Sequence, residues 1–486
     1  MQRDLFSSIT SEFAGRILHA LIAGLLLLFL TRTLGPESYG IYALALSIFA
    51  FSRLFSEAGF ARAAARYVAE YKDHDQAKTD AVLTQSSVMV IAAATLVSMA
   101  VVLLADPIAM ILDEPALAPV LVFGSGIVLF YSLHQYNRII LQGYERVATS
   151  AKLHATEAVF SGVFVVAFVL YSPSAVSAVL GFGVGYGLAT IVGARFVRKV
   201  RTPSETTASI RTEVRSQVAL YTAPLTVTRL SNVVDQQVDV LLVGFFLNPL
   251  AVAYYSIGKE LSRLISVPAA SVGFALSPTY GADKAAGRLE SAVAVYQESL
   301  TKVLVLYVPA CTGIVLVADI AIPTIFGAGY EGAVTVVQIL AVFIFFQALV
   351  YISSPAIDYL GRARSEATVK FGTSTANLLL NLLLIPLVGV VGAAVATVLT
   401  QGVFALATVY IVYTELPFDP AAVGRTLGRV TAVTAIMAVV VFGLLQAFSG
   451  YAALTLGVGV GTGVWLVSCH VFDLLDYREL ATMLTQ

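Results

Sequence analysis

Long apolar runs alternate with short polar connections along the whole chain. A helix needs about 20 mainly apolar residues to cross the hydrocarbon core of a membrane. Runs of this kind lie near residues 13–32, 41–61, 82–104, 119–140, 153–171, 176–195, 218–246, 252–275, 295–317, 334–357, 371–388, 391–413, 426–447 and 451–472. The pattern predicts an all-α integral membrane protein that crosses the bilayer about fourteen times.

Lysine and arginine gather in every second connection. Connections after odd-numbered spans hold little besides Arg32. Connections after even-numbered spans hold the other basic residues: Arg62, Arg66, Lys72, Lys78, Arg138, Arg146, Lys152, Arg195, Arg198, Lys199, Arg201, Arg211, Arg215, Lys284, Arg288, Arg362, Arg364, Lys370, Arg425 and Arg429. Because basic loops resist translocation, we expect both termini in the cytoplasm and the protein in the cell membrane, inner or plasma.

The chain also repeats itself. Three residue pairs share a spacing of 213: Leu34 with Leu247, Pro36 with Pro249 and Tyr42 with Tyr255. Six spans separate the copies, so both copies enter the membrane in the same sense. The repeat predicts two parallel six-helix lobes around a central cleft, with two added helices. The predicted parts are an N-lobe at 1–200 (helices 1–6), a cytoplasmic linker at 201–217, a C-lobe at 218–414 (helices 7–12), and helices 13 and 14 with a cytoplasmic tail at 415–486.

Composition and motifs exclude several function classes. The chain is 58% hydrophobic and 12% charged with a mean hydropathy of +0.85, and its net charge of −1 argues against a nucleic-acid partner. No nucleotide loop or catalytic motif is present, so we expect no enzyme. The five histidines show no metal-ligand spacing along the chain. We expect no cofactor beyond a coupling ion, H⁺ or Na⁺.

The segment from Thr31 to Ala43 reads TRTLGPESYGIYA. It resembles the first turn of polysaccharide flippases, which tend to show an LGPxxYGxY pattern there. Residues 55–60, FSEAGF, resemble the short apolar and glycine segment of the second span in that family. The resemblance places the chain in the multidrug/oligosaccharidyl-lipid/polysaccharide exporter superfamily. It implies two lobes that open alternately to each side of the membrane.

Several cations fall within or near predicted spans. A cation at the bilayer centre costs about 2.5 to 3.5 kcal/mol on insertion scales, so such residues usually face a cavity or a partner. Arg16 and Arg229 differ by the repeat spacing of 213, which predicts matching positions in the two lobes. We expect the set to bind the phosphate or pyrophosphate of a lipid carrier, because guanidinium groups donate paired hydrogen bonds to phosphate. The set is Arg16, Arg53, Arg229, Lys259 and Arg263.

The resemblance implies the same use of cations in the first, second and eighth spans. The alternative is that each cation pairs with a neighbouring acid and only holds helices together. Arg53 could pair with Glu57 at i, i+4, and Arg263 with Glu260 at i, i+3.

Carboxylates and amides also lie within predicted spans. Glu57, Glu157, Asp235 and Asp239 could bind H⁺ or Na⁺ and couple an ion gradient to lobe movement, or they could simply balance nearby cations. The amides could contact sugar hydroxyls or hydrogen-bond between helices. They are Asn377, Asn381 and Gln401.

Two glycine runs occur within the predicted spans. They comprise Gly181, Gly183, Gly185 and Gly187, and Gly457, Gly459, Gly461 and Gly463. Their small-xxx-small spacing favours close packing of neighbouring helices.

Together these features predict a non-catalytic flippase. It would move an oligosaccharide linked to polyprenyl phosphate or pyrophosphate from the inner to the outer leaflet by alternating access, coupled to an ion gradient. The alternatives are a multidrug or organic-cation antiporter, a lipid II flippase, and a non-transporting scaffold for glycan assembly. Expected partners are the lipid-linked oligosaccharide, membrane lipids and glycosyltransferases or a polymerase, around a monomer.

Overall fold

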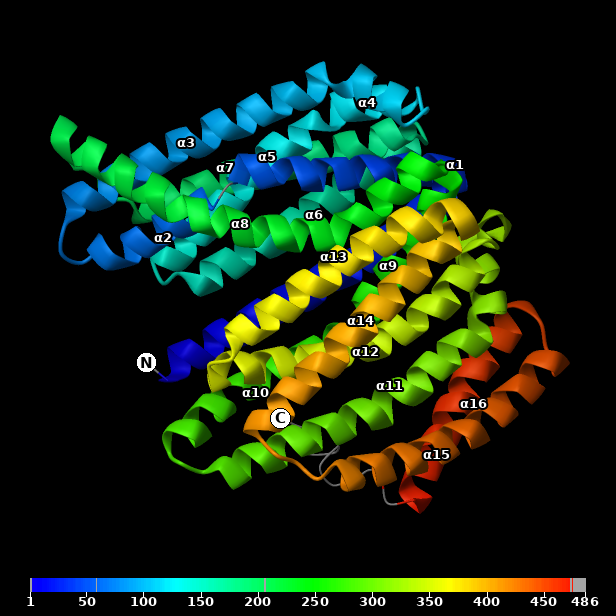
Figure 1. The fold of residues 1–486 in the computed structure, drawn as a ribbon. Helices are drawn as coiled ribbons and strands as arrows, with labels where there is room; N and C mark the ends of the chain where they lie inside the picture. The colour runs from blue at the N-terminus through cyan, green and yellow to red at the C-terminus, as the bar shows by residue number, and fades with distance from the viewer. Residues whose placement is uncertain (1, 58, 205–206, 473, 475–486) are drawn as a thin grey trace. The chain divides into compact units, whose positions relative to one another are not determined.

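The computed structural model describes the backbone of residues 2–57, 59–204, 207–472 and 474. It describes their side chains except those of 2–17, 208–209, 211, 219, 223–235, 274–275, 277–278, 281 and 283–285. Every regular element of the described chain is a helix. The helices are α1 (Gln2–Glu57), α2 (Phe60–Tyr71), α3 (Gln76–Leu103), α4 (Ala105–Ile111), α5 (Leu117–Gly143), α6 (Val147–Tyr171), α7 (Ala175–Val200), α8 (Ala208–Phe246), α9 (Pro249–Ile265), α10 (Val267–Ala285), α11 (Leu289–Phe326), a 3-10 turn (Ala328–Tyr330), α12 (Ala333–Leu360), α13 (Ala363–Val388), α14 (Val390–Glu415), α15 (Pro420–Ala447) and α16 (Gly450–Val471) (Figure 1).

The predicted all-α membrane fold is confirmed. In the described part of the chain, eleven helices are long and apolar enough to cross a membrane, judged by length and composition. The fourteen predicted spans lie in these helices and in α8, α9 and α10 to within a residue or two, except that the second, at 41–61, runs four residues past the end of α1 into the start of α2. Two predicted spans share α1, and the predicted eighth span is divided between α9 and α10.

The break inside α1 lies where the sequence predicts the first turn. Gly35 has φ 74° and ψ 169° within an otherwise continuous helix, and Pro36 follows it. Glycine fits a positive φ without a steric penalty, and a residue before proline is disfavoured in the helical conformation. At the repeat-related position, α8 ends at Phe246 and α9 begins at Pro249. The chain therefore leaves the helix before a proline at both related positions.

The described structure divides into two compact units, Met1–Ala253 and Tyr254–Gln486. Within the first unit, α8 packs against α1, α2 and α3. The predicted C-lobe begins at residue 218 and so includes most of α8, whereas the first compact unit extends to Ala253. The division into two six-helix lobes stays a prediction. Residues 208–217 of the predicted linker are also helical, since α8 already begins at Ala208.

The start of the predicted linker is held against α3. Arg201 Nε donates to Asp80 Oδ1 at 2.6 Å, and Arg201 Nη2 donates to Thr84 Oγ1 at 2.8 Å. The hydrogen bond to Asp80 raises the pKa of the Arg201 guanidinium above its ordinary value. This charge therefore stays in place at physiological pH.

Glycines bring α6 and α7 into close contact, as the sequence predicts. A Cβ added to Gly181 would lie 2.5 Å from Val165 Cα, and one added to Gly185 would lie 2.5 Å from Ser161 Cα. A Cβ on Gly183 would meet nothing nearer than Ile127 Cγ1 at 4.0 Å. Only one face of the glycine run is therefore required for packing.

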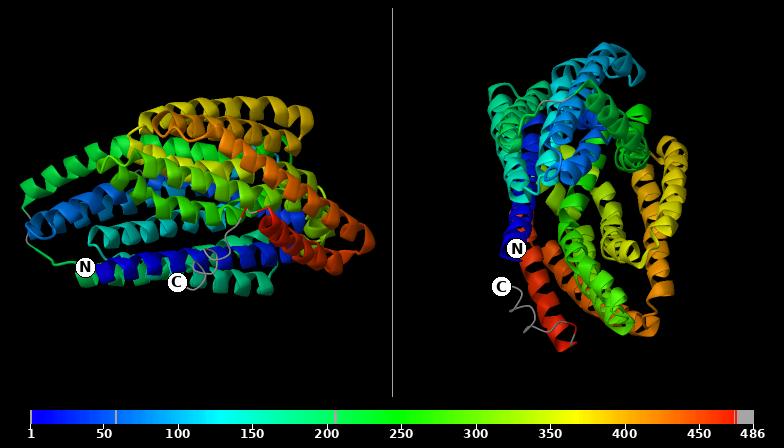
Figure 2. Two further views of the ribbon diagram at one scale, coloured as in Figure 1. Left: turned by 90° about the horizontal axis from the view of Figure 1, so that it is seen from below. Right: turned by 90° about the vertical axis from the view of Figure 1, so that its left-hand side faces the viewer.

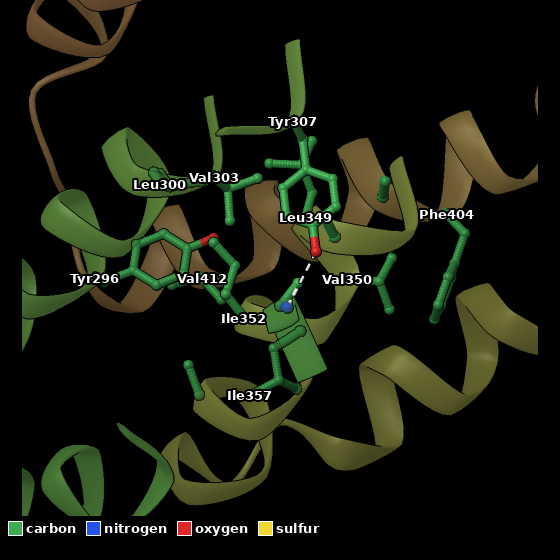
Figure 3. Close-up of a cluster of buried hydrophobic side chains, with 14 of the residues drawn as sticks. Tyr296, Leu300, Val303, Tyr307, Leu349, Val350, Ile352, Ile357, Phe404 and Val412 are labelled. Atoms are coloured by element: carbon green, nitrogen blue, oxygen red, sulfur yellow. Dashed lines mark hydrogen bonds between the residues drawn. The ribbon is translucent and has the colours of Figure 1, made fainter. Parts of the chain in front are cut away.

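The core of the second unit lies among α11, α12 and α14. Its buried side chains interdigitate around Tyr296, Tyr307, Leu349 and Phe404 (Figure 3). The Tyr307 hydroxyl accepts a hydrogen bond from Ala269 N at 3.1 Å and lies 3.1 Å from Ile265 O, to which it donates.

Tyr307 thereby bonds to backbone groups on both sides of the break between α9 and α10. Pro268 lies in the first turn of α10, and a proline there removes an N–H and opposes continuation of the preceding helix. Backbone groups freed in this way need new partners at membrane depth. The hydroxyl of Tyr307 on α11 is the partner of two backbone groups, Ala269 N and Ile265 O.

The two added helices pack together and against α11, as the three views show (Figures 1 and 2). Buried Val305, Val430, Val433 and Cys469 form a small apolar cluster between them. Trp465 Nε1 donates to Val305 O at 3.2 Å. Helices α15 and α16 are therefore part of the second unit.

Substitution of Gly185 by alanine tests the close packing of α6 and α7. We expect Gly185→Ala to lower the stability by about 1 to 3 kcal/mol, because the new methyl group would meet backbone atoms. Gly183→Ala is the matched control, and we expect it to be neutral or to stabilise by up to about 1 kcal/mol through helix propensity. Thermal unfolding of the purified variants in detergent measures both. Equal losses for the two variants would contradict the packing.

Single-cysteine labelling tests the predicted orientation. The native Cys311 and Cys469 are buried, which keeps background labelling low. Thr202→Cys and Ala116→Cys place thiols at exposed positions in connections after an even-numbered and an odd-numbered predicted span. We expect a membrane-impermeant thiol reagent added to intact cells to label position 116 and not position 202. The reverse pattern would overturn the orientation.

Candidate functional site

Buried polar side chains gather in the first unit among α1, α5, α6 and α7. Glu157 of α6 is 3% exposed, although a carboxylate is costly to remove from water. His154 Nδ1 lies 3.5 Å and His19 Nδ1 lies 3.7 Å from Glu157 Oε2. Ser161 Oγ donates to Glu157 Oε1 at 3.3 Å. Each oxygen of the carboxylate thus faces a polar group.

A third buried histidine lies on α5. His134 is 2% exposed, and its ring centroid lies 6.2 Å from that of Tyr186 on α7. The two histidines in contact with Glu157 are His19 and His154.

Spacing along the chain does not predict this cluster. The histidines show no metal-ligand spacing in sequence, yet one donor atom from each of His19, His154 and Glu157 lies within 4.8 Å of the others. The i, i+3 spacing of His154 and Glu157 on one helix face is the signal that could have revealed half of it. His19 comes from α1 and cannot be paired with them from spacing.

Arg53 lies on the face of an aromatic ring. Its Cζ atom is 3.7 Å from the centroid of the Tyr131 ring, a close cation–π contact between α1 and α5. A guanidinium stacked in this way keeps the N–H groups at its edge available for hydrogen bonds.

Further rings continue from Tyr131 across α7 and back to α1. Tyr131 meets Tyr186 edge-on at 5.1 Å between centroids, Tyr186 meets Phe182 at 6.4 Å, and Phe182 meets Tyr42 at 6.2 Å. We call Tyr42, Tyr131, Phe182 and Tyr186 the aromatic row. Tyr131 is the member of the aromatic row that contacts Arg53, and its ring positions the guanidinium.

Besides Glu157, two further predicted coupling carboxylates are buried in the first unit. Glu57 is on α1, one turn after Arg53, and Asp239 is on α8. The adjacent Ser56 hydroxyl shares a 2.7 Å hydrogen bond with Ser132, which ties this part of α1 to α5. A role of either carboxylate in ion coupling stays a prediction.

Two predicted phosphate-binding cations lie on α9 in the second unit. Arg263 is paired with Glu260, to which its Nε donates at 3.0 Å, so the predicted alternative pairing is confirmed. The Arg263 side chain is 58% exposed. Lys259 lies 5.7 Å from the centroid of the Tyr255 ring. Any contact of these cations with a phosphate stays a prediction.

The predicted sugar-binding amides are buried and bonded to protein. Asn381 Nδ2 donates to Asn377 Oδ1 at 3.0 Å, and Asn377 Nδ2 donates to Thr400 Oγ1 at 3.2 Å. Gln401 Nε2 donates to Gln347 Oε1 at 2.8 Å. The bond of Asn377 to Thr400 joins α13 to α14 and that of Gln401 to Gln347 joins α14 to α12, whereas Asn381 bonds within α13. A contact of these amides with sugar hydroxyls stays a prediction.

Three predicted site residues lie outside the described side chains. Arg16 belongs to α1, and Arg229 and Asp235 belong to α8, but only their backbone is described. The predicted pair of arginines on matching helices therefore stays a prediction.

Two family models match the chain. A family model described as polysaccharide biosynthesis protein matches residues 5–282, and the MatE model matches residues 224–387. The chain is 23% identical over 375 residues to a Shigella flexneri protein named as an O-antigen transporter, covering 76% of this chain and 88% of that one. It is 24% identical over 245 residues to a Haloferax volcanii protein named as a low-salt glycan biosynthesis flippase, covering 50% and 51% of the two chains.

Solved structures share the fold. The lipid II flippase MurJ in an inward closed conformation matches with a TM-score of 0.74 and 18% identity over 98% of this chain and all of that one. An inward-facing multidrug resistance MATE family transporter of the MOP superfamily matches with a TM-score of 0.66 and 14% identity, over 82% of this chain and 95% of that one. At these identities the likeness establishes the fold alone.

A double-mutant cycle tests the contact between Arg53 and Tyr131. Arg53→Met and Tyr131→Leu each remove one partner, and we expect a coupling energy of about 0.5 to 2 kcal/mol in thermal unfolding. Tyr131→Phe keeps the ring face and should retain most of the coupling. If the stability losses of the two single variants add up to that of the double variant, the stacking contributes no coupling energy.

Proposed function

Because the chain belongs to the polysaccharide biosynthesis protein family, we propose that it is a flippase for a lipid-linked oligosaccharide. The chain is a multi-pass membrane protein, and its family and fold are those of transporters and flippases, not of catalytic enzymes. The observation that carries the proposal is the match to a protein named as an O-antigen transporter over 76% of the chain. We propose the cell membrane as its location and transfer from the inner to the outer leaflet as its direction.

Arg53 is our principal candidate for recognition of the carrier phosphate among the described residues. A lipid-linked sugar carries a phosphate or pyrophosphate between two uncharged parts, so a cation near membrane depth is the complementary group. The aromatic row holds the guanidinium of Arg53 by its face. Arg16, Arg229, Lys259 and Arg263 complete the proposed set on the strength of their sequence positions.

We propose that an ion gradient, of H⁺ or Na⁺, drives the cycle of alternating access. The buried carboxylates of Glu57 and Asp239 support this proposal, because an acid at membrane depth can be neutralised by a bound cation. Glu157 differs from these two, since it already faces two histidines.

The alternative function is a multidrug exporter of the same fold, and the MatE match over residues 224–387 supports it. An exporter of organic cations needs an anionic and aromatic binding site, whereas Arg53 adds a positive charge to the aromatic row. Arg53 therefore favours an anionic substrate. A lipid II flippase would differ from the proposed protein in its substrate. A scaffold for glycosyltransferases or a polymerase would differ in that it transports nothing.

Surface glycan in cells that depend on this protein tests the proposal. We expect Arg53→Ala to reduce exported glycan by about tenfold and to leave the lipid-linked precursor inside, since a charge-assisted hydrogen bond contributes about 1.5 to 3 kcal/mol. Arg16→Ala combined with Arg229→Ala should have a larger effect. Arg425→Ala, an exposed arginine at the start of α15, is the control and should export normally. Normal export by all variants at equal protein levels would refute phosphate recognition by these cations.

A further inference from the structure

Three side chains of the first unit present metal-binding atoms to one another. His19 comes from α1, and His154 and Glu157 come from α6. One donor atom from each lies within 4.8 Å of the others. The two imidazole rings are stacked, with 4.5 Å between their centroids and 22° between their planes. Both Nδ1 atoms lie near the same carboxylate oxygen.

Two imidazoles and a carboxylate form a donor set that Zn²⁺ uses widely in proteins. Ligand bonds of about 2.1 Å in a tetrahedral site place the ligand atoms ~3.4 Å apart. The His154 and His19 Nδ1 atoms are already 3.5 and 3.7 Å from Glu157 Oε2. All three atoms could bind one ion only after the rings turn out of their stacked arrangement, because an imidazole binds a metal in the plane of its ring and the two planes are only 22° apart.

We propose that His19, His154 and Glu157 bind a divalent transition metal ion, with Zn²⁺ as the natural ligand. Ser161 holds the other carboxylate oxygen, which leaves Oε2 directed toward the histidines. The metal would join α1 to α6 within one unit. The proposal concerns binding alone and does not depend on which lipid the protein transports.

Simple ion pairing is the competing explanation. A protonated histidine beside Glu157 would satisfy the carboxylate without a metal. The two explanations differ in a measurable way, because a metal needs neutral imidazoles and is released by acid, whereas an ion pair needs a protonated imidazole.

Metal titration of the purified full chain distinguishes them. The protein is freed of any affinity tag, stripped with EDTA in detergent and titrated with Co²⁺, a spectroscopic substitute for Zn²⁺. We expect one Co²⁺ per chain with the visible absorption of a four-coordinate ion, displaced by Zn²⁺ and lost on acidification below the ordinary histidine pKa of about 6.5. Zn²⁺ should also raise the unfolding temperature of the wild-type protein.

Histidine variants locate the site. His154→Gln and His19→Gln should each lower Co²⁺ affinity by at least about tenfold and abolish the stabilisation by Zn²⁺. His74→Gln and His470→Gln change exposed histidines elsewhere and should bind like the wild type. Glu157→Gln is used only if it remains folded, since the two histidine variants are sufficient. Unchanged affinity in both variants, or no binding by the wild type at micromolar Co²⁺, would overturn the proposal in favour of ion pairs.

Discussion

A single constraint governs this molecule: lipid offers no hydrogen bonds, so every polar group at membrane depth must find its partner inside the protein. The backbone meets the constraint by forming helices throughout the described chain. Where helix geometry fails, between α9 and α10, the hydroxyl of Tyr307 bonds to Ala269 N and Ile265 O. Where helices must approach closely, Gly181 and Gly185 have no side chain, and this allows α7 to pack directly against α6.

The same constraint identifies the side chains that deserve a functional explanation. Amides such as Asn377 and Asn381 hydrogen-bond to one another or to a neighbouring helix, and the exposed Arg263 pairs with Glu260 on its own helix, so each has a partner within the protein. Arg53 is different, because its described contact is with the face of the Tyr131 ring, and such stacking does not use the hydrogen-bonding edge of the guanidinium. In a family of glycan transporters, the phosphate of a lipid carrier is an acceptor of suitable charge.

Much of the fold could be predicted from sequence because it depends on local patterns. Apolar runs set the helices, and Gly35 with Pro36 sets the first break. The pairing of Glu260 with Arg263 follows from an i, i+3 spacing on one helix. By contrast, the contact of Arg53 with Tyr131 depends on the register of α1 against α5, and that of His19 with Glu157 depends on α1 against α6. Apolar helix faces have many near-equivalent registers, so composition and spacing do not specify these contacts.

The central claim is that this chain alone moves a lipid-linked sugar across a membrane. Its most direct test is reconstitution of the purified protein into liposomes that carry a fluorescent polyprenyl-pyrophosphate oligosaccharide, followed by leaflet-specific quenching with and without an imposed H⁺ or Na⁺ gradient. The account predicts that the protein speeds exchange between leaflets relative to protein-free liposomes, that a gradient increases this rate, and that Arg53→Ala reduces it. Exchange no faster than in protein-free liposomes under every gradient, with correctly folded protein, would contradict it and favour a scaffold.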